Sequence, residues 1–166
     1  MIDERCIKSD VRIRLFEEME TQYDNQNKQY FKDLLSHEDS VIRTRVICIL
    51  ADMSGIDSVE PISRVLEEDK NALVRHEAAF SLGQIGYQTA MPALFNAIKS
   101  DPSYFVRHEA AVALGVIGSE EGREILNEAL KDESEEVRES AIIALANIDY
   151  VSTMKRNNKF TRMTGG

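Results

Sequence analysis

A thirteen-residue pattern recurs along this chain at intervals of 31 or 32 residues. It reads VRHEAAFSLGQIG from Val74, VRHEAAVALGVIG from Val106 and VRESAIIALANID from Val137, and a more diverged copy, IRTRVICILADMS, begins at Ile42. Self-similarity at a fixed period is typical of architectures in which each unit packs only on its neighbours. The repeat therefore constrains the fold more than any other feature of the sequence.

Each copy of the pattern follows a second apolar-periodic segment, which predicts that the repeating unit is a hairpin of two helices. On a 100° helical wheel Val74, Ala78 and Leu82 share one side, so we expect them in the core. Ala79 and Gly83 lie on one shoulder of the same helix. Small side chains at these positions would let neighbouring second helices approach closely.

The sequence thus predicts an all-α solenoid of about four to four and a half repeats. Glycines are expected to end the second helices, and prolines to lie in the first turns of the helices that follow, at Gly55, Gly86, Gly118, Pro61 and Pro92. The expected division is a capping helix at 1–24, repeats at about 25–54, 55–86, 87–118 and 119–149, which together make up 25–149, and a flexible basic tail at 150–166. A partial repeat at Val11-Arg12-Ile13-Arg14-Leu15 lies 31 residues before the Ile42 copy.

The consensus VR-x-x-AA-x-x-LG-x-IG resembles the HEAT-like repeats first named from phycobilisome lyases, over about residues 30–149. The resemblance implies the same helical-hairpin solenoid. It does not by itself imply an activity, because such repeats serve scaffolds, lyases and hydroxylases alike.

Charge is distributed unevenly along the chain. Residues 150–166 contain four basic residues and no acidic one, which leaves 16 basic against 29 acidic residues, a net charge of −13, in residues 1–149. An acidic body repels phosphate backbones and attracts cationic groups, so we expect a basic protein segment rather than nucleic acid as a partner, unless the charge serves only solubility.

No apolar run is long enough for a membrane span, and the charged first residues do not form a secretory signal, so a cytoplasmic protein without a membrane partner is expected. Cys6 and Cys48 have no metal-type spacing and are expected to be inert thiols without a disulfide. No nucleophile elbow, phosphate-binding loop or catalytic-triad spacing is present in the sequence.

The residues that the repeat does not explain are His76-Glu77 and His108-Glu109, at one position of two adjacent copies. A histidine in the first turn of a helix gains nothing from the helix dipole. The wheel places both histidines about 150° from the centre of the core stripe, so they are expected on the inner, concave surface formed by the second helices. His37, in a predicted turn, is expected to be solvated.

Equivalent positions on adjacent repeats lie roughly 8–10 Å apart, close enough for two imidazoles to share one metal. His76, His108 and Glu109 would form the two-histidine, one-carboxylate set of non-haem iron sites. Glu77 is a fourth candidate, as a ligand, a bridge or a partner of a ligand. The expected wall of an adjacent substrate pocket is a neighbouring column of side chains, Cys48, Phe80, Val112 and Ile143.

Duplication of a repeat would also copy a His-Glu pair that has no function, and that interpretation stays open. Against it, the flanking copies have Thr44-Arg45 and Glu139-Ser140 at these positions. The pairs are therefore confined to two adjacent repeats, as a site requires.

The segment His76-Glu77 through Leu82-Gly83-Gln84, followed by His108-Glu109 with Leu114-Gly115, resembles one half of deoxyhypusine hydroxylase, a HEAT-repeat enzyme whose paired His-Glu motifs hold two irons. The resemblance implies an iron cofactor and O₂-dependent hydroxylation of a cationic, polyamine-modified lysine. The family has two such pairs in one chain and this sequence has one, so a symmetric homodimer would be needed for a di-iron site.

Two functions follow from the sequence. The first is an iron-binding or other transition-metal-binding oxidoreductase, with no catalytic residues assigned beyond the metal ligands. The second is an interaction scaffold that binds a basic segment in its acidic groove. A phycobilin-lyase-like role is a third, weaker hypothesis, because it rests on the shared repeat alone.

Overall fold

The computed structural model describes residues 4–53 and 55–157, and these residues contain helices and no strand. The all-α class predicted from the sequence is confirmed. The α-helices are α1 Glu4–Asp24, α2 Lys28–Leu34, α3 Ser40–Asp52, α4 Val59–Glu68, α5 Ala72–Ile85, α6 Met91–Ser100, α7 Tyr104–Ile117, α8 Arg123–Ala129 and α9 Glu135–Arg156. Short 3₁₀ turns, Ile56–Ser58, Gln88–Ala90 and Glu120–Gly122, precede α4, α6 and α8.

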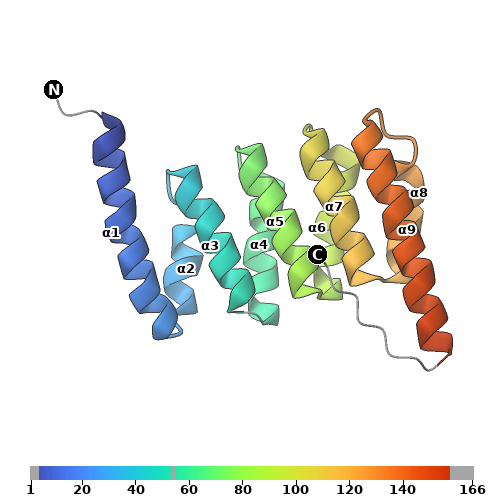
Figure 1. Cartoon of the computed structure of the whole chain (residues 1–166), viewed down its shortest axis with the longest axis horizontal. Helices are drawn as coiled ribbons and strands as arrows, with labels where there is room; N and C mark the ends of the chain where they lie inside the picture. Colours follow the sequence, from blue (N-terminus) through green and yellow to red (C-terminus); the bar gives the residue numbers. More distant parts are fainter. Residues whose placement is uncertain (1–3, 54, 158–166) are drawn as a thin grey trace.

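The helices after α1 form four hairpins that stack in sequence order (Figure 1). The second helices, α3, α5, α7 and α9, lie side by side in one layer, and the first helices, α2, α4, α6 and α8, lie in the layer behind them. This is the predicted HEAT-like solenoid. The exposed side of α3, α5, α7 and α9 is called the second-helix surface below.

The helix ends follow the expected chemistry at most positions. Gly86 and Gly118 end α5 and α7 in the left-handed conformation, with φ of 75° and 65°. Asn71 caps the start of α5 by accepting a hydrogen bond from the Leu73 amide. Gly55 differs from the other two glycines, because it has φ of 133° and lies beyond the end of α3, at the start of a 3₁₀ turn.

Small residues on the shoulder of each second helix permit close packing, as the sequence predicts. A Cβ atom added to Gly83 on α5 would lie 2.9 Å from the Cα and Cβ atoms of Ala113 on α7. A Cβ added to Gly115 would lie 2.8 Å from the Cα atom of Ala144 on α9. Glycine is therefore required at both positions by the approach of the next helix rather than by backbone conformation.

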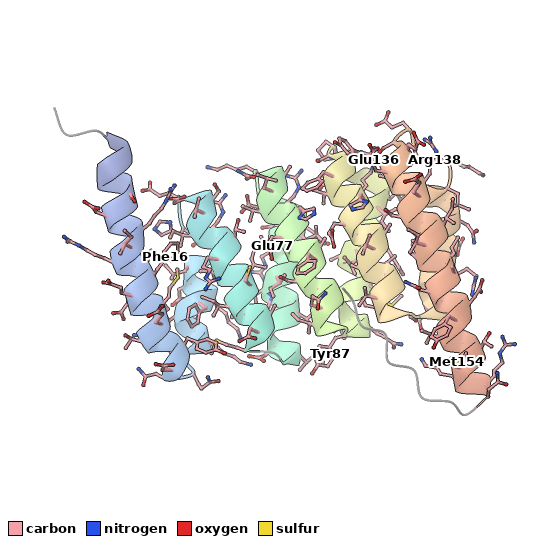
Figure 2. All side chains as sticks on the ribbon, viewed as in Figure 1. Phe16, Glu77, Tyr87, Glu136, Arg138 and Met154 are labelled. Carbon is pink, nitrogen blue, oxygen red and sulfur yellow. The ribbon has the colours of Figure 1, made fainter. Side chains whose placement is uncertain are left out.

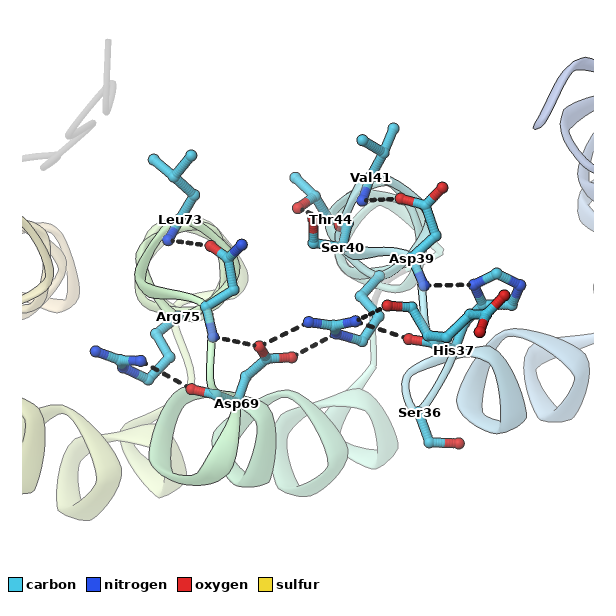
Figure 3. A network of polar contacts seen from close by, with 12 residues as sticks. Ser36, His37, Asp39, Ser40, Val41, Thr44, Asp69, Leu73 and Arg75 are labelled. Carbon is cyan, nitrogen blue, oxygen red and sulfur yellow. Dashed lines mark hydrogen bonds and ion pairs between the residues drawn. The ribbon is translucent and has the colours of Figure 1, made fainter. Parts of the chain in front are cut away.

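A ladder of buried arginine–aspartate pairs links successive repeats, and Figure 3 shows the pair formed at Asp69. Arg43 on α3 donates from Nε and Nη2 to both carboxylate oxygens of Asp69, at 2.6 and 2.9 Å, and from Nη1 to the carbonyl oxygen of His37. Two further pairs have the same geometry, Arg75 with Asp101 and Arg107 with Asp132. Bidentate pairs of this kind fix the register of one hairpin on the next.

The first rung of the ladder is different because His37 occupies the position that Asp69 has in the next repeat. The Asp69 carboxylate accepts a hydrogen bond from the Asn71 amide at 2.8 Å, and His37 Nδ1 accepts one from the Asp39 amide at 3.0 Å. Asp39 then pairs with Arg12, at 2.6 and 3.1 Å, and ties α1 to the solenoid. The expectation that His37 is merely solvated is thus wrong, since its ring caps a turn.

The expectation of a flexible segment from residue 150 onwards is wrong for residues 150–156, which continue α9 to Arg156. The buried spacing of the helix does not stop at Ile148, because Val151 is also buried. Asp149 stands where α5 and α7 end in glycine, so no left-handed residue ends the helix there. Residues 158–166 of the predicted tail lie outside the described residues.

None of the described helices combines the length and the apolar character that crossing a membrane requires.

Candidate functional site

The second-helix surface brings together two of the four predicted ligands, from adjacent repeats. His76 on α5 places Nε2 3.2 Å from Oε2 of Glu109 on α7. The side chain of His76 is 22% exposed and that of Glu109 is 10% exposed. Glu109 is thus buried and His76 is half-buried, and neither side chain belongs to the apolar core.

The ring of His76 is held in place by an aromatic side chain from the next repeat. It stacks on Phe105 of α7, with ring centroids 3.9 Å apart and planes inclined by 5°. Phe105 covers one face of the imidazole, so the ring edge that carries Nε2 is directed at Glu109. Stacking of this kind limits the rotation that the side chain would otherwise have.

His108 is oriented in the same direction along the solenoid by a serine. Its Nδ1 lies 2.7 Å from Oγ of Ser140 on α9. The Ser140 hydroxyl donates its single proton to the carbonyl oxygen of Glu136, at 2.7 Å, so it accepts a hydrogen bond from His108 Nδ1–H. A neutral His108 consequently keeps the lone pair on Nε2, the nitrogen available to a metal.

Glu77 lies on the side of α5 that faces α3 (Figure 2). Its Oε1 accepts a hydrogen bond from the Cys48 thiol, with the sulfur at 3.1 Å. Burial, together with this carboxylate, raises the pKa of Cys48 to about 12. The thiol is therefore a neutral hydrogen-bond donor, which agrees with the inert role expected of it.

The direction of each side chain follows from its position in the repeat. The side chain at the histidine position points toward the next repeat, and the side chain at the glutamate position points toward the previous one. His76 therefore meets Glu109, and His108 meets Ser140. Glu77 engages α3, so it is separated from the His76–Glu109 pair. Among the described side chains, those of residues 9–53 and 55–157, no three from His, Cys, Asp or Glu converge as a metal site would require.

The spacing of the His76–Glu109 pair nevertheless fits two neighbouring ligands of one metal. With metal–ligand bonds of about 2.1 Å, adjacent donors of an octahedral site lie about 3.0 Å apart. The observed 3.2 Å is close to that separation. One chain therefore presents part of a ligand set, a histidine and a carboxylate from two repeats.

The four residues predicted to form a pocket wall are not equally enclosed. Phe80 is 40% and Ile143 is 63% exposed, whereas Cys48 and Val112 are half-buried. Cys48 also lines a cleft of about 830 Å³ between α1 and α3, together with Met19, Tyr23 and other residues. In a single chain Phe80 and Ile143 are open apolar surface.

Two residues that orient the histidines were not predicted from the sequence, Phe105 and Ser140. Ser140 occupies the glutamate position of its repeat, where side chains point toward the previous repeat, so its place beside His108 could have been inferred. Phe105 directly precedes the repeated pattern and has no counterpart among the consensus residues. No sequence signal singles it out.

Comparison with protein families identifies the class. Residues 59–146, more than half of the chain, match the family model for HEAT repeats. The chain belongs to the HEAT-repeat family.

Among solved structures, the chain is similar to human deoxyhypusine hydroxylase in complex with glycerol, with 26% identity and a TM-score of 0.73 over 90% of this chain and 51% of that one. An engineered protein matches with 24% identity and a TM-score of 0.54, over 74% of this chain and 62% of that one. The CpcE and CpcF complex of phycocyanin lyase from Nostoc sp. matches with 18% identity and a TM-score of 0.51, over 79% and 68%.

This chain thus spans about half the length of the deoxyhypusine hydroxylase that it resembles. Comparison with curated proteins gives no significant match.

Proposed function

We propose that this HEAT-repeat protein binds a transition metal, iron in the first instance, on its second-helix surface and acts as an O₂-dependent hydroxylase. The observation that carries the proposal is the 3.2 Å approach of His76 Nε2 to Glu109 Oε2 across two adjacent repeats. The likeness to deoxyhypusine hydroxylase supports iron as the metal.

His76, Glu109 and His108 would hold the metal. The stack of Phe105 on His76 sets the direction of one imidazole and shields one of its faces from water. The bond to Ser140 leaves Nε2 of a neutral His108 free to coordinate. Reduced iron bound there would supply O₂ activation for the insertion of oxygen into an unactivated C–H bond.

A second copy of the chain would complete the ligand set. The described part of one chain brings together only two donors at bonding separation, and the side chain of Glu77, although next to His76 on α5, is directed at Cys48 on α3. A symmetric homodimer with second-helix surfaces face to face would present every candidate ligand twice. Open apolar side chains such as Phe80 and Ile143 would be covered in this arrangement and would then form the wall of a substrate pocket.

A second candidate function is a non-catalytic scaffold that binds a basic protein segment. Large apolar side chains stay exposed on the second-helix surface, among them Leu73 at 64% and Ile143 at 63%. The −13 net charge of residues 1–149 would attract a basic partner. A phycobilin-lyase-like role is weaker, because the likeness to the lyase subunits is one of fold.

Metal analysis of the full chain purified without oxygen tests the first proposal. We expect iron to copurify, or to load at up to one equivalent per chain, and a His37→Ala control to load equally. If neither iron nor another transition metal binds at any protein concentration, the metal proposal is wrong and the scaffold remains. A chain that binds metal as a strict monomer would exclude completion of the site by a second copy.

A further inference from the structure

The last of the described helices, α9, exposes the face that in every earlier second helix packs on the next repeat. Arg138 is at the fourth arginine position, after Arg43, Arg75 and Arg107. Its Nη1 donates to the carbonyl oxygens of Asp132 and Glu133 at 2.7 and 3.0 Å, and the three earlier arginines donate to carbonyl oxygens at the equivalent turns. Each of these earlier arginines also donates hydrogen bonds from Nε and Nη2 to an aspartate carboxylate. Among the described residues Arg138 has no carboxylate within ion-pair distance.

The small residues that let one second helix pack closely on the next are also replaced on α9. Ile142 stands where Ala79 and Ala111 stand, and it is 58% exposed although both alanines are fully buried. Ala146 stands where Gly83 has no room for a Cβ atom against the next helix. A further repeat at the usual close spacing would collide with both side chains, so this face suits a wider helix contact.

The charges on this face are complementary to those of a second copy of the helix that runs antiparallel to it. Residues spaced by three, four, seven or eleven share one side of a helix. From the N-terminal end the side chains on this face are Glu135, Arg138, Ile142, Ala146, Asp149 and Arg156. The order of charge is negative, positive, two apolar residues, negative, positive, so an antiparallel copy opposes unlike charges at each end and apolar residues in the middle.

We propose that α9 is a contact surface for a second copy of this chain, which packs its own α9 antiparallel across a two-fold axis near residues 144 and 145. Arg138 of each copy then gains the carboxylate it lacks, from Asp149 of the other. Asp149 has room for a second cation because its side chain is 68% exposed while it pairs with Arg123. Arg156 approaches Glu135 at both ends of the contact, and Ile142 loses its exposure to water.

This contact is independent of the proposed metal site. It uses none of the His-Glu residues, and it leaves both second-helix surfaces open on the same side. A chain that forms both contacts would assemble beyond a dimer, as a closed tetramer where the two two-fold axes intersect, whereas a chain that forms this one alone would be a dimer.

Light scattering and sedimentation of the full chain over a range of concentrations test the proposal. We expect the wild type to have twice the mass of Arg138→Glu, with the dissociation constant of the contact raised at least tenfold by that change. Asp149→Arg should weaken association equally, and the double variant should recover it. A mass that equals one chain at all concentrations, or an association that Arg138→Glu leaves unchanged, overturns the proposal and leaves this face to a hairpin of another protein.

A crosslinking comparison keeps the test valid if the charge variants fold poorly. In a Cys6→Ser, Cys48→Ser background, Ile142→Cys should be joined by a short bis-maleimide, and adding Arg138→Glu should abolish the product. Ile143→Cys is the matched control, an equally exposed isoleucine about 100° further round the helix. A product from Ile143→Cys with none from Ile142→Cys would place the contact on the second-helix surface and contradict the role of α9.

Discussion

His76 and Glu109 are 33 residues apart in the sequence, yet Nε2 of one lies 3.2 Å from Oε2 of the other. The register of the repeat creates this contact, because a side chain at the histidine position leans toward the next second helix. Stacking on Phe105 then fixes the ring. The pair is the centre of the proposed metal site.

Ser140 tests the orientation of His108 without removing a ligand. Ser140→Ala deletes the acceptor of the Nδ1–H bond, and the loss of such a partner lowers metal affinity by about 10- to 100-fold. Ser152→Ala is the control, since this serine is also on α9 but bonds to Glu120. Anaerobic titration with Fe²⁺ measures both variants; equal affinities would show that Ser140 does not act on the metal.

The arginine–aspartate ladder should dominate the stability of the stack. Asp101→Asn keeps the hydrogen bond to the Ser103 amide but removes the charge opposite buried Arg75, which should lower the free energy of unfolding by about 3 kcal/mol. Glu60→Gln breaks the exposed pair with Arg64 and should cost less than about 1 kcal/mol. Urea denaturation compares them, and equal losses would contradict the role of the ladder.

Acid should weaken the same ladder. Burial works to raise the pKa values of Asp69 and Asp132, but hydrogen bonds from Arg43 and Arg107 outweigh it and hold both below their usual range. The hydrogen bond from Arg12 lowers the pKa of Asp39. Carboxylates with lowered pKa contribute stability that is fully present above the unfolded value of about 3.9 and is lost as the pH falls through the folded values.

The free energy of unfolding should therefore stay level from pH 7 to about 5 and fall steeply below about pH 4. Urea denaturation at each pH measures it. A stability that does not fall below pH 4 would mean that these ion pairs contribute little to the fold.

Gly83 tests the close approach of α5 and α7. Gly83→Ala places a methyl group against Ala113 and should destabilise the protein by about 1–3 kcal/mol, although alanine favours helices. In Gly122→Ala the nearest atom would be 3.7 Å from the new Cβ, so little change is expected. Thermal unfolding compares the two variants. A Gly83→Ala variant as stable as the wild type, or more stable, would contradict the close contact between α5 and α7.

Cys48 should be a slow nucleophile. With its pKa at about 12, the thiolate fraction at pH 8 is about a thousandfold smaller than that of a free thiol. Alkylation with iodoacetamide in a Cys6→Ser background measures the rate. Glu77→Gln should speed the reaction, because the carboxylate helps to raise the pKa of Cys48. The increase should be partial, since burial is the larger cause and persists in the variant. A fast reaction of the wild type would contradict the hydrogen bond between Cys48 and Glu77.

The sequence predicted the solenoid because its signals are local. Core spacing at Val74, Ala78 and Leu82, left-handed glycines at Gly86 and Gly118, and the fixed period define each hairpin and its neighbour. The same register predicts that His76 faces away from the core. The position of the histidines on the second-helix surface follows from repetition alone.

Contacts between repeats could not be predicted in the same way. Whether Glu77 or Glu109 approaches His76 depends on whether each side chain points toward the next repeat or the previous one. A helical wheel of one repeat does not show this direction. The end of α9 was misjudged because the repeat pattern stops at Asp149, whereas the buried spacing continues to Val151. The role of His37 was not predicted because the hydrogen bond that its ring accepts from the Asp39 amide depends on the conformation of the turn.

The most direct test of the metal site is an anaerobic Fe²⁺ titration of the wild type, His76→Ala and His108→Ala, with circular dichroism on the same samples. We expect saturable binding by the wild type, at least a hundredfold loss of affinity in either variant, and unchanged helicity, since neither histidine belongs to the core. Equal binding by all three proteins, or no binding by the wild type, would contradict the proposed metal site.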